Sequence, residues 1–178
     1  MLSPFLIGTT IYLRAFERAD APLLAQYIND PDVTLTLKVY RPMNTQREEE
    51  FIENTSKGEH DLALGIALKS TDQLIGAVGF HGIDFKDRKA DFGIMIAVKE
   101  EWNKGHGTEA TKLMIAYGFE TLNLHRIELR VYENNPRAIR VYEKVGFKRE
   151  GTLRQEHYRQ GRYWDTHVMA ILRDEWRK

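Results

Sequence analysis

The sequence has no cysteine, no net charge and no long hydrophobic run. The absence of cysteine excludes disulfides, thiolate zinc sites, iron–sulfur clusters and a cysteine nucleophile. The 26 basic and 26 acidic residues cancel, so no overall attraction draws the chain to nucleic acid or to an anionic membrane. The apolar segments 74–80 and 94–98 are far shorter than the roughly 20 residues that cross a bilayer, and residues 1–10 lack the basic start of a secretion signal. We therefore expect a cytoplasmic protein with neither a nucleic-acid nor a membrane partner.

The length of 178 residues, 42% of them hydrophobic, is typical of one globular domain. We find no internal repeat or linker, so we predict a single domain over residues 1–178, with its core at about 9–173. Helical spacing and end signals predict helices that begin near residues 20, 45, 104 and 135. Alternating apolar residues between turn residues predict strands at 11–16, 62–68, 74–83, 90–98, 127–132, 147–158 and 163–172. This order predicts an α+β fold with a mostly antiparallel central sheet, flanking helices and one strand–helix–strand insert.

Two glycines stand one residue apart at the start of the helix predicted from about residue 104. The segment reads Trp102, Asn103, Lys104, Gly105, His106, Gly107, Thr108, Glu109, Ala110. Glycine lets the backbone come close to a ligand, and the free N–H groups of a helix start form a site for phosphate. A tight turn that needs glycine for its geometry alone would give the same pattern. The segment therefore indicates a diphosphate site or a structural turn.

The same glycines formally fit a dinucleotide fingerprint, with Glu128 as the acidic residue that follows. In that motif the glycines leave a strand directly, whereas six residues separate Val98 from Gly105. Glu128 also lies inside its predicted strand instead of at its end, and about 100 residues precede a motif that should open a βαβ unit. The pattern thus disfavours a nicotinamide enzyme.

A second segment has strong end signals for a short helix. It reads Asn135, Pro136, Arg137, Ala138, Ile139, Arg140, Val141, Tyr142, Glu143, Lys144, Val145, Gly146, with a capping Asn, Pro at the first helical position and Gly just past the end. Together the two segments resemble the coenzyme A-binding segments of the GNAT superfamily of N-acetyltransferases. The element order matches that superfamily from Ile11 to Leu172. Shorter motifs at 117–119, 122–126 and 161–163 are similar to the branch that includes ribosomal-protein N-terminal acetyltransferases and spermidine acetyltransferases.

The resemblance implies that acetyl-CoA is the co-substrate and that no metal takes part. Its acetyl group would pass, by direct attack in a ternary complex, to a primary amine of a peptide N-terminus, a polyamine or another small molecule. The resemblance also implies a homodimer, and cofactor contacts from Met95, Ile96, Ala97, Asn103, Lys104, Gly105, His106, Gly107, Thr108, Asn135, Arg137 and Ala138. Many members have Gln or Arg where this chain has Trp102, so a side-chain contact from that position is not implied.

Tyr142 matches the residue that returns a proton to the coenzyme A sulfur in the superfamily. The apolar spacing of 138, 141, 142 and 145 is equally typical of a buried helix face, which would make Tyr142 a core aromatic. For the base that frees the amine, Asp91 matches the strand position where relatives often carry glutamate, and it shares a face with Gly93 and Met95. His81 is a second candidate because its pKa suits proton uptake.

The resemblance implies that residues 29–57 and 156–164 shape the acceptor site. Four acidic residues in the first segment could attract a cationic amine or simply form a solvated helix face: Glu48, Glu49, Glu50 and Glu53. Aromatic residues could line an apolar wall or pack: Tyr40, Tyr158, Tyr163 and Trp164. A non-catalytic acyl-CoA sensor on the same fold is the alternative to an enzyme, and the presence of Tyr142 favours the enzyme.

Overall fold

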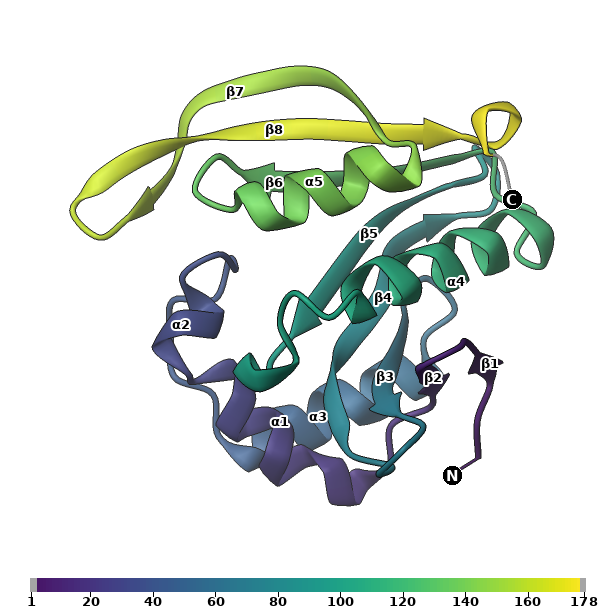
Figure 1. The fold of residues 1–178 in the computed structure, drawn as a ribbon, viewed down its shortest axis with the longest axis vertical. Helices are drawn as coiled ribbons and strands as arrows, with labels where there is room; N and C mark the ends of the chain where they lie inside the picture. The colour runs from purple at the N-terminus through teal and green to yellow at the C-terminus, as the bar shows by residue number, and fades with distance from the viewer. Residues whose placement is uncertain (1–2, 177–178) are drawn as a thin grey trace.

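The computed structural model describes residues 3–176 and consists of one central sheet with helices on both faces (Figure 1). The strands are β1 (Leu6–Ile7), β2 (Ile11–Arg14), β3 (Leu62–Leu68), β4 (Leu74–Asp84), β5 (Lys89–Ile96), β6 (Arg126–Tyr132), β7 (Lys148–Arg159) and β8 (Arg162–Leu172). The helices are α1 (Ala21–Ile28), α2 (Pro31–Thr34), α3 (Thr45–Lys57), α4 (His106–Glu120) and α5 (Pro136–Val145). The sheet order is β1-β2-β3-β4-β5-β6-β8-β7, and this confirms the predicted α+β fold.

The sheet divides at its one parallel pair, β5 and β6. These strands pair only through Lys89–Arg126, Ala90–Ile127 and Asp91–Glu128. Beyond that point β5 stays paired with β4 as far as Ile96, whereas β6 stays paired with β8. The two halves of the sheet therefore separate (Figure 1), and the edge of β5 after Asp91 has no strand beside it.

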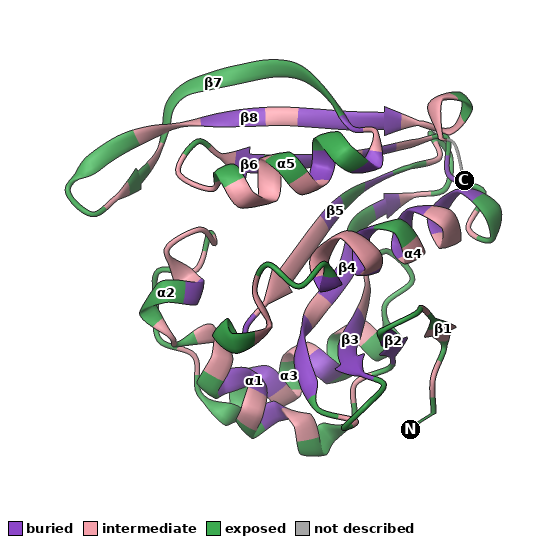
Figure 2. Ribbon diagram, viewed as in Figure 1, coloured by how far each residue is buried: buried purple, intermediate pink, exposed green. Residues whose placement is uncertain are grey.

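The two faces of the sheet carry separate apolar clusters. The side chain of Leu74 packs with α1 and α3, whereas that of Ile75 belongs to the main core with α4 and α5. Because successive side chains of a strand point to opposite faces, α4 and α5 cover one face and α1 and α3 the other. Gly118 brings α4 close to the sheet, since a Cβ there would lie 2.8 Å from the Phe80 ring. Figure 2 shows the buried residues concentrated along β2, β4, β6, β8 and the inner side of α4.

Several boundaries differ from those predicted by the sequence. Helix α4 begins at His106 because Gly105, at φ 91°, has a left-handed conformation that a helix cannot include. Two short elements were not predicted from the sequence. Strand β1 has two residues, and helix α2 has four residues, about one turn. Within residues 3–176 no helix is both long enough and apolar enough to cross a membrane.

Candidate active site

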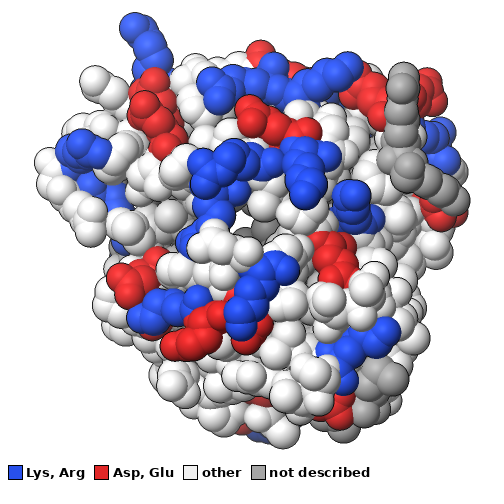
Figure 3. Space-filling model, viewed as in Figure 1, with Lys and Arg blue, Asp and Glu red and all other residues white. Residues whose placement is uncertain are grey.

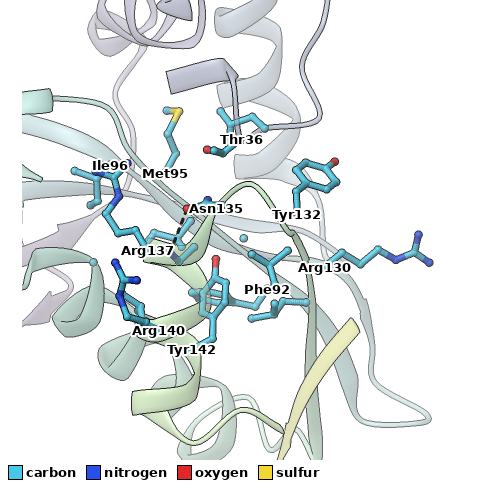
Figure 4. A pocket seen from close by; sticks show the side chains of 18 of the residues that line it. Thr36, Phe92, Met95, Ile96, Arg130, Tyr132, Asn135, Arg137, Arg140 and Tyr142 are labelled. Carbon is cyan, nitrogen blue, oxygen red and sulfur yellow. Dashed lines mark hydrogen bonds between the residues drawn. The ribbon is translucent and has the colours of Figure 1, made fainter. Parts of the chain in front are cut away.

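A cavity of about 1120 Å³ lies where β5 and β6 separate. Its walls come from both strands, from the loop and first turn of α4, from α5 and from the segment after α2. Figure 3 shows Lys and Arg side chains around a hollow near the middle of this face, and Figure 4 draws side chains that line the cavity and labels ten of them. Both segments that the sequence singled out thus meet at one cavity.

The glycine segment turns sharply before α4 begins. Asn103 and Gly105 both have positive φ, at 63° and 91°, which reverses the chain within a few residues. The first intrahelical hydrogen bond runs from Glu109 N to Gly105 O, at 3.0 Å. The N–H groups of residues 106–108 therefore have no intrahelical acceptor, and these residues line the cavity. The arrangement suits an anion, because these donors and the positive end of the helix dipole act together.

Polar side-chain contacts from the buried His106 and from Glu109 hold this turn in place. The imidazole of His106 is only 7% exposed as a residue; its Nε2 lies 3.0 Å from Glu101 Oε2 and its Nδ1 lies 3.0 Å from Thr10 Oγ1. The Glu109 carboxylate accepts hydrogen bonds from the backbone N–H groups of Thr9 and Thr10 and from the Thr10 hydroxyl. The side chain of His106 therefore supports the turn, and the group it offers to the cavity is its amide.

Helix α5 contributes a second set of donors. The Asn135 side chain accepts a hydrogen bond from Ala138 N at 3.1 Å, which confirms the predicted cap (Figure 4). Arg137, Arg140 and Lys144 also line the cavity. The guanidinium of Arg137 lies over the ring of Trp102, with 3.9 Å between Cζ and the ring centroid.

Tyr142 lies inside the cavity wall, with its hydroxyl directed into the open space (Figure 4). Its ring packs edge-on against Phe92, with centroids 6.2 Å apart, and against Phe147 at 5.8 Å. The residue is 7% exposed, and this burial raises the pKa of its phenol, so the group is protonated at neutral pH. Tyr142 is thus both a core aromatic and a hydroxyl donor facing the cavity, and the two interpretations of the sequence are compatible.

Three ionisable residues line the cavity in one row across β4, β5 and β6. His81 is the cross-strand partner of Asp91, and Asp91 is the partner of Glu128. Burial is the main cause that raises the pKa of Asp91; the charge and hydrogen bonding of Glu128 raise it further, and Arg130 and His81 oppose this. Glu128 forms an ion pair with Arg126, with 2.9 Å between Glu128 Oε2 and Arg126 Nη2. On the other side of the row, His81 Nδ1 lies 3.5 Å from Asp61 Oδ1.

Most of the residues predicted to contact the cofactor line this cavity, but two do not. Ala97 is buried, and its N–H donates to Ile75 O at 2.8 Å, so that amide is already used. The Lys104 ammonium pairs with Glu101 at 3.0 Å and lies outside the lining.

The acidic helix α3 does not reach the main cavity. Glu49 pairs with Arg18 and Glu53 with Lys57. Glu48 is buried, which raises the pKa of its carboxyl group. Glu50 lines a separate, smaller pocket of about 390 Å³, which shares His81 with the main cavity. Of the two alternatives for this acidic run, a solvated helix face is thus favoured over attraction of an amine to the main cavity.

The structure adds residues that the sequence did not single out as parts of the site. Glu128 was considered only for a dinucleotide motif, yet it stands beside Asp91. Tyr132, four residues further along β6, also lines the cavity, and its ring stacks on that of His157 with 3.6 Å between centroids. Thr36, Leu37 and His157 line it too, and they fall within the segments 29–57 and 156–164 that were expected to shape the acceptor site. Their proximity depends on strand pairing and loop packing between distant segments, for which the sequence carries no local signal.

Comparisons with known proteins agree with this geometry. The Acetyltransferase (GNAT) domain family matches residues 10–148. The N-acetyltransferase p20 of Bacillus licheniformis is 33% identical over 171 residues, covering 92% of this chain and 93% of the relative. Spermidine N(1)-acetyltransferase of Vibrio cholerae is 31% identical over 170 residues, covering 96% and 97%. A crystal structure of spermidine N-acetyltransferase from Vibrio cholerae, in complex with CoA and spermine, superposes with a TM-score of 0.87 at 30% identity, covering 94% of this chain and 98% of that one.

The chain therefore belongs to the GNAT acetyltransferase family, and it is an acetyl-CoA-dependent N-acetyltransferase. The cavity fits this co-substrate, since unpaired amides and arginines offer donors to phosphate at one end and Tyr142 faces the interior. A dinucleotide enzyme is not supported, because the glycines follow a short 3₁₀ turn at Lys99–Glu101 and the sheet is mostly antiparallel.

Proposed function

We propose that this enzyme transfers the acetyl group of acetyl-CoA to a primary amine of a cationic small molecule, of which polyamines are the best candidates, by direct attack within one ternary complex. The observation that carries the proposal is the cavity at the β5–β6 division. It joins the phosphate-binding end of α4 to a row of carboxylates and to the Tyr142 hydroxyl. Donors for the diphosphate, a proton donor and a proton acceptor thus border one space.

Asp91 receives the proton of the attacking amine in this proposal. A free alkyl amine has a pKa near ~10.4, so only about one molecule in a thousand is neutral at pH 7. A carboxylate of ordinary pKa is a weak base, and the raised pKa of Asp91 brings it closer to the working pH. Glu128 assists because its charge raises this pKa, and Arg126 fixes Glu128 in place.

The free edge of β5 supplies the group that polarises the thioester carbonyl. In an antiparallel pair, alternate residues direct their N–H groups to the partner strand, and the others direct theirs to the opposite edge. Since β5 has no neighbour on that edge beyond Asp91, amides in the segment that includes Met95 and Ile96 face the cavity. Fixed N–H donors stabilise the charge that develops on the carbonyl oxygen.

Tyr142 then returns a proton to the departing sulfur. Its phenol is protonated at neutral pH, so it has a proton to give to the sulfur as the C–S bond breaks. Because a free thiol has a pKa of ~8.5, below that of a phenol, this transfer is uphill, and the phenolate regains its proton from solvent to complete the cycle. The Asn135 side-chain amide and the Arg137 guanidinium border the path to the phosphate-binding turn and are proposed as contacts for the cofactor, whereas the Ala138 amide is engaged by the Asn135 cap and contributes to the cavity wall.

A cationic acceptor is supported by the carboxylates of the cavity wall. Besides Asp91 and Glu128, Asp32 and Glu156 also line it. Asp32 is paired with Lys99 at 2.8 Å and Glu156 with Arg130 at 3.0 Å, so an ammonium group at either would share the carboxylate with that cation. A polyamine carries a second positive charge that such groups bind, and spermidine acetyltransferases are among the relatives. A peptide N-terminus lacks that second charge near the reacting amine.

The test is release of free thiol from acetyl-CoA with spermidine, spermine, a diamine, a monoamine of similar length and a panel of N-terminal peptides. We expect a higher kcat/KM for the polyamines than for the monoamine. No turnover with any amine, together with intact CoA binding, would overturn the proposal and favour a binding module. Turnover of peptides alone would change the acceptor class.

We also propose that the chain forms a homo-oligomer, with a dimer as its unit. A similar solved structure is described as a dodecamer of spermidine N-acetyltransferase from Vibrio cholerae. In this chain the β7–β8 hairpin exposes Tyr158 and Tyr163, at 59% and 61% of their surfaces. Light scattering on the purified protein measures the mass, and a monomer at all concentrations would contradict the proposal.

A further inference from the structure

Trp102 is fixed at the rim of the cavity by the end of β5. Its indole Nε1 donates to Ile96 O at 2.8 Å, and its backbone N–H donates to Lys99 O at 3.1 Å. Ile96 is the last residue of β5, so the ring is attached directly to the strand edge that borders the cavity. Two bonds therefore define the position and the plane of this ring before any ligand binds.

Arg137 approaches the same ring from the other half of the sheet. It is the second residue of α5, which follows β6, and its Cζ lies 3.9 Å from the Trp102 centroid. Figure 4 shows its side chain beside Ile96. The stacked pair thus connects the β5 side of the cavity to the β6 side.

The Arg137 guanidinium is half-buried, and within residues 3–176 it has no hydrogen-bond or ion-pair partner. Burial is the main cause that lowers its pKa, and nearby Arg140 adds to this. A guanidinium has five N–H donors, and those of Arg137 border the open cavity with no protein acceptor among the described residues. The group is therefore arranged for a ligand that supplies negative charge.

In the described part of the chain, no free carboxylate on this side of the cavity pairs with the Arg137 guanidinium. Glu101, the acidic residue nearest in the loop, is already paired with Lys104 and with His106. The other charged groups on this side, Arg140 and Lys144, are basic, and the free amides of residues 106–108 are also donors. The ligand must therefore be an anion with several acceptor oxygens.

We propose that Trp102 is a positioning residue that holds the Arg137 guanidinium flat against its ring, so that Arg137 donates to the diphosphate bound at the start of α4. A guanidinium stacks through its face and forms hydrogen bonds in its plane, so the stacking leaves the N–H groups free. The inference rests on the proposed binding of coenzyme A and names a contact for its diphosphate.

The experiment measures dissociation constants by titration calorimetry for CoA and for dephospho-CoA, which keeps the diphosphate and lacks the 3′-phosphate. Arg137→Ala should weaken both by about 10- to 100-fold, as expected for loss of hydrogen bonds to a charged group. Trp102→Leu should weaken both by about 3- to 10-fold. Trp102→Phe, which keeps an aromatic face, should restore most of that loss, and the double variant Trp102→Leu, Arg137→Ala should bind no more weakly than Arg137→Ala alone.

Turnover separates positioning from a general structural defect. Trp102→Leu should raise KM for acetyl-CoA with kcat nearly unchanged, and thermal unfolding monitored by circular dichroism checks that the variant folds. Wild-type affinity in both single variants, fully additive losses in the double variant, or a loss seen with CoA and absent with dephospho-CoA would each overturn the inference; the last would assign Arg137 to the 3′-phosphate. If the wild-type enzyme binds CoA as described but acetylates no amine, the proposed function fails and this contact stands.

Discussion

At the scale of single residues, Tyr142 combines a packing role and a proton-donor role, and removal of its hydroxyl oxygen tests the second without the first. Its ring packs against Phe92 and Phe147, while its hydroxyl faces the cavity. Tyr142→Phe keeps the ring and removes the proton donor. We expect kcat to fall by about 100- to 10,000-fold, with KM for acetyl-CoA and the unfolding temperature close to wild type. Steady-state kinetics measure kcat and KM, and a thermal melt measures the unfolding temperature. A wild-type kcat would show that the sulfur takes its proton from another source.

The carboxyl pair at the division of the sheet gives a second prediction, on pH dependence. Glu128→Gln removes a negative charge beside Asp91, so the pKa of Asp91 should be lower in the variant than in the wild type. Burial is then the one remaining cause that raises this pKa. Since the deprotonated form of Asp91 is the base, the acidic limb of kcat/KM should move to lower pH. The groups that face Asp91 and remain are His81 and Arg130. The measurement is kcat/KM against pH with a saturating co-substrate.

The matched control for that measurement is Glu133→Gln, the same substitution at an exposed residue outside the cavity. It should leave the pH profile unchanged. An unmoved acidic limb in Glu128→Gln, or an equal shift in both variants, would contradict the assignment of Asp91 as the base.

At the scale of elements, the contact of α4 with the sheet depends on one glycine. A Cβ at Gly118 would lie 2.8 Å from Phe80 Cζ and 2.9 Å from Ile127 Cδ1, and both side chains are fully buried. Gly118→Ala should therefore lower the free energy of unfolding by about 1–3 kcal/mol, because the core must move to accept the methyl group.

Gly151→Ala is the control, since a Cβ at Gly151, on the exposed strand β7, meets no atom within 4 Å. It should change stability by less than about 0.5 kcal/mol. Urea unfolding measures both variants, and equal stability of the two would show that the core adapts without cost.

Most elements were predicted from the sequence: the longer strands from their alternating pattern, to within two residues at each end, and helix α5 from its end signals. The short elements β1 and α2 were missed. Helix α5 has its capping Asn135, its Pro136 and its terminal Gly146 in the sequence itself, and the observed bounds agree. Strand β1 is only Leu6–Ile7 and exists because it pairs with Tyr12 and Leu13. The sequence predicts a start of α3 at Asn44 or Thr45, with Glu48 placed for a capping box with Thr45. The structure has Asn44 as the cap, whose side chain accepts a hydrogen bond from Arg47 N.

The residues of the site also fall into those that a local sequence pattern predicts and those that it does not. The glycine turn and the Asn135 segment were found from the sequence because each needs particular residues in a fixed order. The proximity of Glu128 to Asp91 comes from the parallel register of β5 and β6, and the stacking of Arg137 on Trp102 comes from the way α5 packs beside the loop. Neither leaves a pattern along the chain.

At the scale of the whole molecule, the cavity lies between two halves of a sheet that are joined by only three residue pairs of β5 and β6. A ligand that contacts both α4 and α5 adds contacts across this division. At 100 times its dissociation constant, CoA should stabilise the fold by about 2.7 kcal/mol. For a chain of this length that corresponds to a rise of roughly 5–10 °C in unfolding temperature.

Differential scanning calorimetry with increasing CoA measures this rise, with NAD as the comparison ligand. CoA should raise the unfolding temperature in a concentration-dependent way, and NAD should not. Stabilisation by NAD in place of CoA would contradict the assignment of the cavity.

The hydroxyl of Thr10 contacts both His106 and Glu109, which lie 96 and 99 residues further along the sequence. The amino-terminal turn is thereby a distant support for the residues that meet the diphosphate. Thr10→Val keeps the size of the side chain and removes both contacts. A search for variants with altered coenzyme A affinity should for this reason return substitutions in this turn, residues 8–10, as well as in the glycine segment, although residues 8–10 are not part of the cavity lining.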